Sequence, residues 1–156
     1  MVIQRWQSVL LLIAAIAMCC FTFMSLGQVQ TPEYTLNFTT LGYTYEGVAT
    51  EGGVSGYYEH TGFLFVLSLV AALLPLVSIF MFKRLSLQVK MCVVAILVLL
   101  ATAAYCGVSG YTAVPDAAVS WSSVIIGVPV ALCAELMAIK YIRHDANLLR
   151  AVDRIR

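Results

Sequence analysis

Charged residues are scarce in this sequence and make up only 11% of its 156 residues. A soluble domain usually carries about 25% charged residues. Hydrophobic residues instead reach 62% of the chain, and they gather into long uninterrupted runs, which is typical of a membrane protein. The scarcity of charge therefore excludes an ordinary soluble globular domain.

The sequence also lacks the clusters of reactive side chains that catalysis or metal binding requires. No C-x-x-C pair occurs, and the long loops hold no cysteine for a disulfide framework. His60 and His144 are predicted to lie on opposite sides of the membrane, which leaves a zinc site unsupported. We therefore expect no enzyme, no catalytic or metal-binding residues and no cofactor. The five cysteines fall inside the apolar segments as small fillers: Cys19, Cys20, Cys92, Cys106 and Cys133.

Four apolar segments are long enough to cross a bilayer. Each is close to the ~20 residues that span a ~30 Å hydrocarbon core, and backbone polar groups in lipid must pair within their own segment, as they do in a helix. The fold class predicted is an all-α membrane protein, a four-transmembrane-helix bundle forming a single membrane domain over residues 1–156. The spans are expected at about residues 9–26, 62–82, 89–107 and 121–141.

The first apolar segment has an alternative interpretation as a cleaved signal peptide. Ser25, Leu26 and Gly27 offer small residues in a plausible cleavage pattern. The apolar run, however, is longer than the ~7–15 residues of a signal peptide, and Arg5 is the only cation before it. A membrane span is therefore favoured, and a purified protein that lacked the first 27 residues would contradict it.

Orientation follows from the nine Lys and Arg residues, all of which flank one side of the predicted spans. The connections on the other side, residues 27–61 and 108–120, contain acids but no Lys or Arg. By the positive-inside rule, both termini face the cytoplasm. Nine dispersed cations without an interleaved aromatic stripe do not form a nucleic-acid surface, so no nucleic acid is expected as a partner.

The extracytoplasmic loop, residues 27–61, contains the pattern of a β-hairpin. Polar and apolar residues alternate from Tyr34 to Leu41, Gly42 follows, and a second short run extends from Tyr43 to Val48. A third short strand is predicted near residues 54–58. Because an isolated hairpin is marginally stable in water, this small cap is expected to rest on the outer helix ends or on a partner.

Glu135 is the lone charged residue in the interior of the predicted spans. An ionisable group inside a membrane is costly and is by default a candidate functional site. We favour a structural interpretation, in which the carboxylate is paired with Lys83, Arg84 or Lys90 or with water entering from the cytoplasm. The alternative interpretation is a proton or cation site.

The cytoplasmic tail, residues 143–156, has helical periodicity. Apolar and basic residues fall on different faces, which predicts a short basic amphipathic helix. Such a helix can lie along the inner leaflet, where arginines meet anionic lipid, or can dock a protein. Packing on the membrane surface is favoured because the segment follows a span directly.

Both ends of the sequence carry motifs. The opening Ile3-Gln4-Arg5-Trp6-Gln7-Ser8 resembles the MIQR-x-Q-[TS] start of a family of small bacterial four-span inner-membrane proteins of unknown function. The tail is similar to that family's R-x-D-E-x-L-V-R-x-x-D-R-[IL]-R ending, from which Ala146 departs. The resemblance implies four helices in a bacterial inner (plasma) membrane and no assigned activity. The matching cytoplasmic signature comprises Gln4, Arg5, Arg143, Asp145, Arg150, Asp153, Arg154 and Arg156.

Together these patterns favour a non-enzymatic scaffold or assembly partner. Its expected partners are the lipid bilayer and either another membrane protein or further copies of itself. The alternative function is a small transporter or channel that uses the intramembrane carboxylate Glu135.

Overall fold

The computed structural model describes residues 3–30, 35–46, 57–60, 62–81, 84–112 and 118–153. Four of the helices in this part of the chain are long and apolar enough to cross a membrane, as the sequence predicts. They are α1 (Ile3–Phe23), α2 (Gly62–Phe80), α3 (Leu85–Thr112) and α4 (Gly127–Asp153). A single 3₁₀ turn, η1 (Ser123–Ile126), leads into α4.

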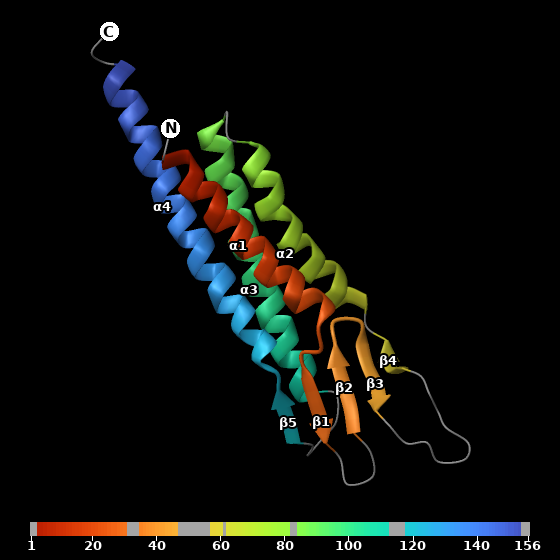
Figure 1. Ribbon diagram of the computed structural model, residues 1–156. Coiled ribbons are helices and arrows are strands. Elements are labelled where there is room, and N and C mark those ends of the chain that lie inside the picture. The colour runs from red at the N-terminus through yellow and green to blue at the C-terminus, as the bar shows by residue number, and fades with distance from the viewer. Residues whose placement is uncertain are drawn as a thin grey trace.

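The four helices lie side by side as a bundle, with both termini at one end and the strands at the other (Figure 1). Helix α1 packs against α2 and α4, and α3 closes the ring between them. The end with the termini is the termini end of the bundle, and the end with the strands is the sheet end. This arrangement brings the first and last helices of the chain into direct contact.

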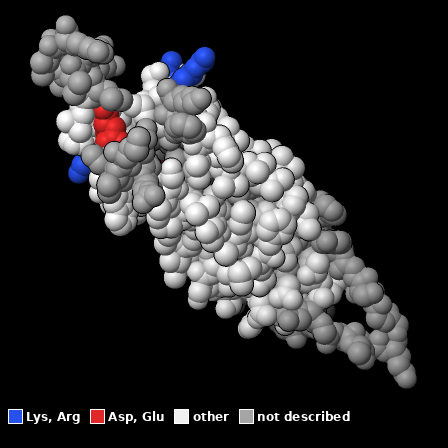
Figure 2. Space-filling view, turned by 45° about the horizontal axis from the view of Figure 1, so that its top comes forward, with Lys and Arg blue, Asp and Glu red and all other residues white. Residues whose placement is uncertain are grey.

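Each helix buries a narrow stripe of residues and exposes apolar side chains elsewhere. On α3 the buried stripe recurs every three or four residues, from Gln88 through Cys92 and Leu99 to Gly110. The outer face is equally apolar, since Leu97 of α3 is 62% exposed and Phe80 of α2 is 81% exposed. Figure 2 shows described charged side chains at the termini end and none over the middle of the visible face. A bundle that is apolar both inside and outside fits lipid rather than water.

A five-stranded antiparallel sheet covers the sheet end, in the order β4-β3-β2-β1-β5. The predicted hairpin is confirmed as β2 and β3, joined through Thr40 and Leu41, and Gly42 adopts a φ of 134° that favours glycine. The third predicted strand appears as β4, slightly later than expected. The strands are β1 (Gly27–Gln30), β2 (Thr35–Thr39), β3 (Gly42–Glu46), β4 (Tyr57–His60) and β5 (Ala118–Trp121).

Two of these strands were not predicted. Strand β1 follows α1 almost directly, and β5 lies where the fourth span was expected to begin, at Trp121. Their pairing places Gly27 opposite Trp121, and a Cβ atom on Gly27 would lie 2.6 Å from the Ser120 carbonyl oxygen. Glycine is therefore needed for the close approach of the two strands. The cap is thus a sheet built from both outer loops rather than a hairpin from one.

The sheet rests on the ends of the helices, as expected for a cap that is marginal alone. The Phe38 ring stacks on Tyr43 with centroids 4.8 Å apart and meets Trp121 edge-on at 6.1 Å. The Tyr43 hydroxyl donates to the Ser109 carbonyl on α3 at 2.7 Å, and the Thr40 hydroxyl donates to the Thr22 carbonyl on α1 at 2.7 Å. Sheet and bundle consequently share one apolar core.

Residues 143–153 are helical, as the periodicity predicts, but they do not form a separate element. Helix α4 continues without a break from Gly127 to Asp153. Its final turns extend past the other helices (Figure 1). The short amphipathic helix expected after the fourth span is therefore the end of the span helix itself, and residues 154–156 lie outside the described part of the chain.

Candidate functional site

The first and last helices of the chain, α1 and α4, are joined at the termini end by a side-chain hydrogen bond. Gln7 on the second turn of α1 donates its Nε2 hydrogen to Oδ2 of Asp145 on α4. Both residues are buried, with 3% and 9% of their surfaces exposed. Gln7 belongs to the opening motif and Asp145 to the tail motif, so this contact joins residues 138 positions apart. The two signature segments are parts of one site.

The sequence alone did not single out Gln7, although its motif was recognised. The available signal is its position, because Gln7, Leu11, Ala14 and Met18 recur at helical spacing and are all buried. A glutamine on such a stripe must find a hydrogen-bond partner within the protein. No single sequence shows that this partner is Asp145.

At this end of the bundle, some buried polar atoms have no hydrogen-bond partner among the described residues. Asp145 Oδ1 and Gln88 Oε1 are both buried without a hydrogen-bond partner among the residues that the structure describes. Gln88 lies in the first turn of α3, and therefore also at the termini end. Buried polar groups in proteins are usually paired with protein or ordered water. The termini end thus contains a small polar interior within an otherwise apolar bundle.

Glu135 lies deeper in the bundle, ten residues before Asp145 and about 15 Å away along the helix axis. It is fully buried, and neither carboxyl oxygen has a hydrogen-bond partner in the described part of the chain. Of the expected cationic partners, Arg84 and Lys90 are exposed and do not bond to it, and Lys83 lies outside the described residues. Pairing with either described cation was therefore a wrong expectation.

The surroundings of Glu135 are mostly small and apolar. Its own helix places Ala131, Ala138 and Ile142 on the same buried face. The thiol of Cys92 on α3 lies within electrostatic range of the carboxyl group. Among the described residues, Glu135 is thus an acidic group on a buried and otherwise largely apolar face of α4.

The backbone positions of the other described signature residues also lie at the termini end. Gln4 and Arg5 lie in the first turn of α1, and Arg150 and Asp153 lie in the last turns of α4. Arg154 and Arg156 fall outside the described residues. The exposed signature side chain that the structure describes is Arg143.

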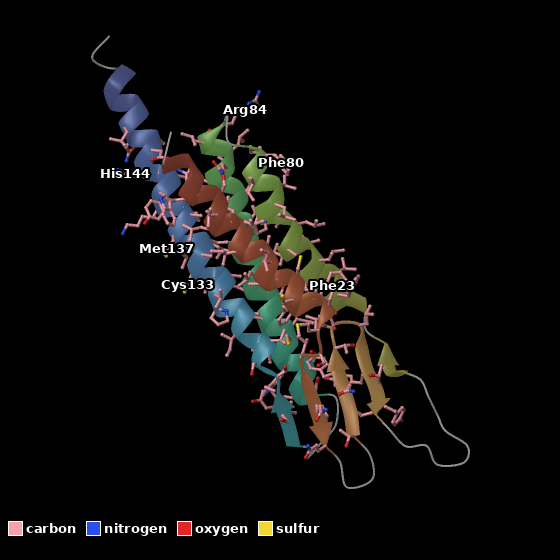
Figure 3. All side chains as sticks on the ribbon, viewed as in Figure 1. Phe23, Phe80, Arg84, Cys133, Met137 and His144 are labelled. Carbon is pink, nitrogen blue, oxygen red and sulfur yellow. The ribbon has the colours of Figure 1, made fainter. Side chains whose placement is uncertain are left out.

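The histidines and cysteines of the described residues are distributed over several elements. Within the described residues, no group of three or more His, Cys, Asp or Glu side chains could hold a metal ion. His144, labelled in Figure 3, lies on α4 near the termini end, whereas His60 belongs to β4 at the sheet end. The cysteines are free, with Cys92 buried in the bundle and Cys133 exposed on the outer face of α4 (Figure 3).

Comparison with known families gives one match. A family model described as a domain of unknown function (DUF4293) matches residues 3–155. The chain belongs to the DUF4293 family. No curated protein and no solved structure matches it. The resemblance predicted from the two end motifs is thereby confirmed at the level of a family of unknown function, and the match extends over all four helices and the sheet of this DUF4293 protein.

The Gln7–Asp145 contact makes a testable contribution to the stability of this DUF4293 protein. Asp145→Ala is expected to lower the free energy of unfolding by about 1–3 kcal/mol, because it leaves the Gln7 amide buried without an acceptor. Replacing both residues by leucine is expected to cost less than the sum of the two single leucine replacements, since no polar group is then left unpaired. Thermal unfolding in detergent micelles measures both effects.

The matched control for this prediction is Asn147→Ala, two residues further along α4 and exposed. Its effect should stay within about 0.5 kcal/mol. Strict additivity of the Gln7 and Asp145 replacements would show that the two side chains do not interact.

Proposed function

We propose that this protein is a non-enzymatic scaffold or assembly partner in a bacterial inner membrane, with both termini in the cytoplasm. The observation that carries the proposal is the buried Gln7–Asp145 hydrogen bond, which ties the two signature segments together at the base of the projecting end of α4. In this proposal the contact holds α1 against α4, and the final turns of α4, which extend past the other helices, offer a surface to a partner.

The distribution of charge supports the proposed orientation. The described Lys and Arg side chains, Arg84, Lys90, Lys140 and Arg143, all lie on the half of the molecule that contains the termini. The sheet is formed by loops without Lys or Arg. By the positive-inside rule, this distribution supports an orientation with the termini end toward the cytoplasm and the sheet outside.

Site-specific photo-crosslinking tests the assembly role. A photo-reactive residue at Leu148, which is 46% exposed on the projecting end of α4, should give a stoichiometric adduct with one protein in native membranes. The matched control is Leu97, which is 62% exposed on the apolar face of α3 and should meet lipid. Asp145→Ala should weaken the Leu148 adduct, because it loosens the base of the projection.

Two results would contradict this function. The first is that Leu148 captures only the protein itself and gives no stoichiometric adduct. The second is that Leu148 and Leu97 capture the same set of proteins in equal amounts, as random encounters in the membrane would produce.

Transport is the second candidate function, and the burial of Glu135 without a described partner is the observation that favours it. Glu135→Gln should then abolish pH-dependent or ion-dependent flux in proteoliposomes. Wild-type vesicles no leakier than empty ones would contradict transport. The assembly role ranks first because Glu135 lines neither the cavity of about 410 Å³ beside Trp121 nor the cavity of about 540 Å³ beside Arg143.

A further inference from the structure

A cavity of about 540 Å³ lies at the termini end between the start of α3 and the final turns of α4. Helix α3 contributes Ser86 and Lys90 to its wall, and α4 contributes Arg143 and Asn147. All four side chains are exposed, so the cavity opens to the surroundings. It is separate from Glu135 and from the Gln7–Asp145 contact, which face the bundle interior.

The groups that line this cavity favour an anion. Lys90 and Arg143 place one positive charge on each wall, and the Ser86 hydroxyl and the Asn147 amide add hydrogen-bond donors. No described acidic residue lines the cavity, and the nearest in sequence, Asp145, accepts its hydrogen bond from Gln7 instead. The two cations therefore have no ion-pair partner among the described lining residues.

The geometry of these donors suits phosphate better than a single carboxylate. An arginine offers a planar fork for two phosphate oxygens, and a lysine on the facing wall supplies a point charge for another. Ser86 is also the second residue of α3, where backbone N–H groups have no acceptor within the helix. These donors reach the cavity from two helices, as the several oxygens of a phosphate require.

The surroundings of the cavity indicate that the phosphate belongs to a lipid. Leu85 and Val89 complete the wall on α3. Below them α3 exposes Val93, Val94 and Leu97 toward the proposed hydrocarbon region. A headgroup phosphate in the cavity would leave its acyl chains beside this apolar face. Basic pockets between transmembrane helices on the cytoplasmic side bind anionic headgroups in this way.

We propose that the cavity between Lys90 and Arg143 binds the phosphate of an anionic phospholipid from the inner leaflet. The lipid would bridge α3 and α4 at the termini end. Binding requires only the purified protein, so it can be tested whether or not the protein has a partner.

Lipid retention by the purified full-length protein tests this proposal. Native mass spectrometry would count bound phosphatidylglycerol and phosphatidylcholine after exchange into mixed micelles that contain equal amounts of both. Wild type should retain phosphatidylglycerol in preference. Lys90→Gln combined with Arg143→Gln should weaken this binding about tenfold or more, since it removes both positive charges that would hold the phosphate.

The control combines Arg84→Gln with Lys140→Gln, which removes the same charge from exposed positions outside the cavity wall. It should leave phosphatidylglycerol retention unchanged. Equal weakening by both double variants would overturn the proposal, because it would show general attraction to the basic end. Inorganic phosphate should displace the lipid only weakly. Wild type that binds inorganic phosphate but shows no preference for phosphatidylglycerol would overturn the assignment to a lipid.

Discussion

Phe38→Ala is expected to remove about 3–5 kcal/mol from the free energy of unfolding, the largest loss that we predict for a single replacement. The Phe38 side chain is 2% exposed and lies between the Tyr43 and Trp121 rings. Its loss leaves a cavity between the sheet and the helices and removes two aromatic contacts. Because β2 is flanked by β1 and β3, this damage should spread through the sheet.

Unfolding in detergent micelles, followed by near-ultraviolet circular dichroism, measures this loss. The matched control is Asn37→Ala on the adjacent position of β2, which points to the opposite face and is only partly buried. The control should change stability by about 0.5 kcal/mol or less. Equal losses for the two variants would show that the sheet does not pack on the bundle through Phe38.

Glu135→Met is expected to have the opposite sign and to raise the free energy of unfolding by about 1–3 kcal/mol. The wild-type carboxyl group is fully buried, and neither oxygen has a described hydrogen-bond partner. Methionine is unbranched and similar in length, so it fills the same space without the penalty of burying a polar group. The midpoint of thermal unfolding should rise by about 2–4 °C per kcal/mol.

Glu135→Gln is the control for this prediction because it keeps both the volume and a buried polar group. Its stability should remain closer to wild type than that of the methionine variant. A methionine variant less stable than wild type would show that Glu135 has a stabilising partner. A variant that gains stability but loses flux or partner binding would assign Glu135 a function, because a costly buried group is then retained for activity.

The four helices were predictable because each apolar run is long, and length in lipid dictates a helix. The hairpin was predictable because β2 and β3 alternate around Gly42. Strands β1 and β5 were not, because each adjoins a predicted span, β1 just after the first and β5 at the start of the fourth. The two strands pair because the end of α1 and the start of α4 lie close together in space. This proximity is a property of the tertiary structure and not of either local sequence.

The candidate site was predictable in its residues but not in its geometry. Asp145 and the segment around Gln7 were recognised as motifs, and the charge pattern assigned them to one side of the membrane. Their hydrogen bond depends on the rotation of α1 and α4 about their axes, which a single sequence does not reveal. The same is true of Glu135, which was expected to pair with a cation or with water but lies on a face of α4 that turns into the bundle.

The position of β1 has a consequence for how this protein is made. Strand β1 lies between β2 and β5 in the sheet (Figure 1). During synthesis β2 leaves the ribosome soon after β1, but β5 is not made until three of the four long helices have been completed. Until then one edge of β1 has no partner strand. Gln7, at the other end of α1, likewise has no Asp145 to accept its hydrogen bond. The contacts of α1 and β1 with the last part of the chain are therefore completed only after β5 and α4 have been made.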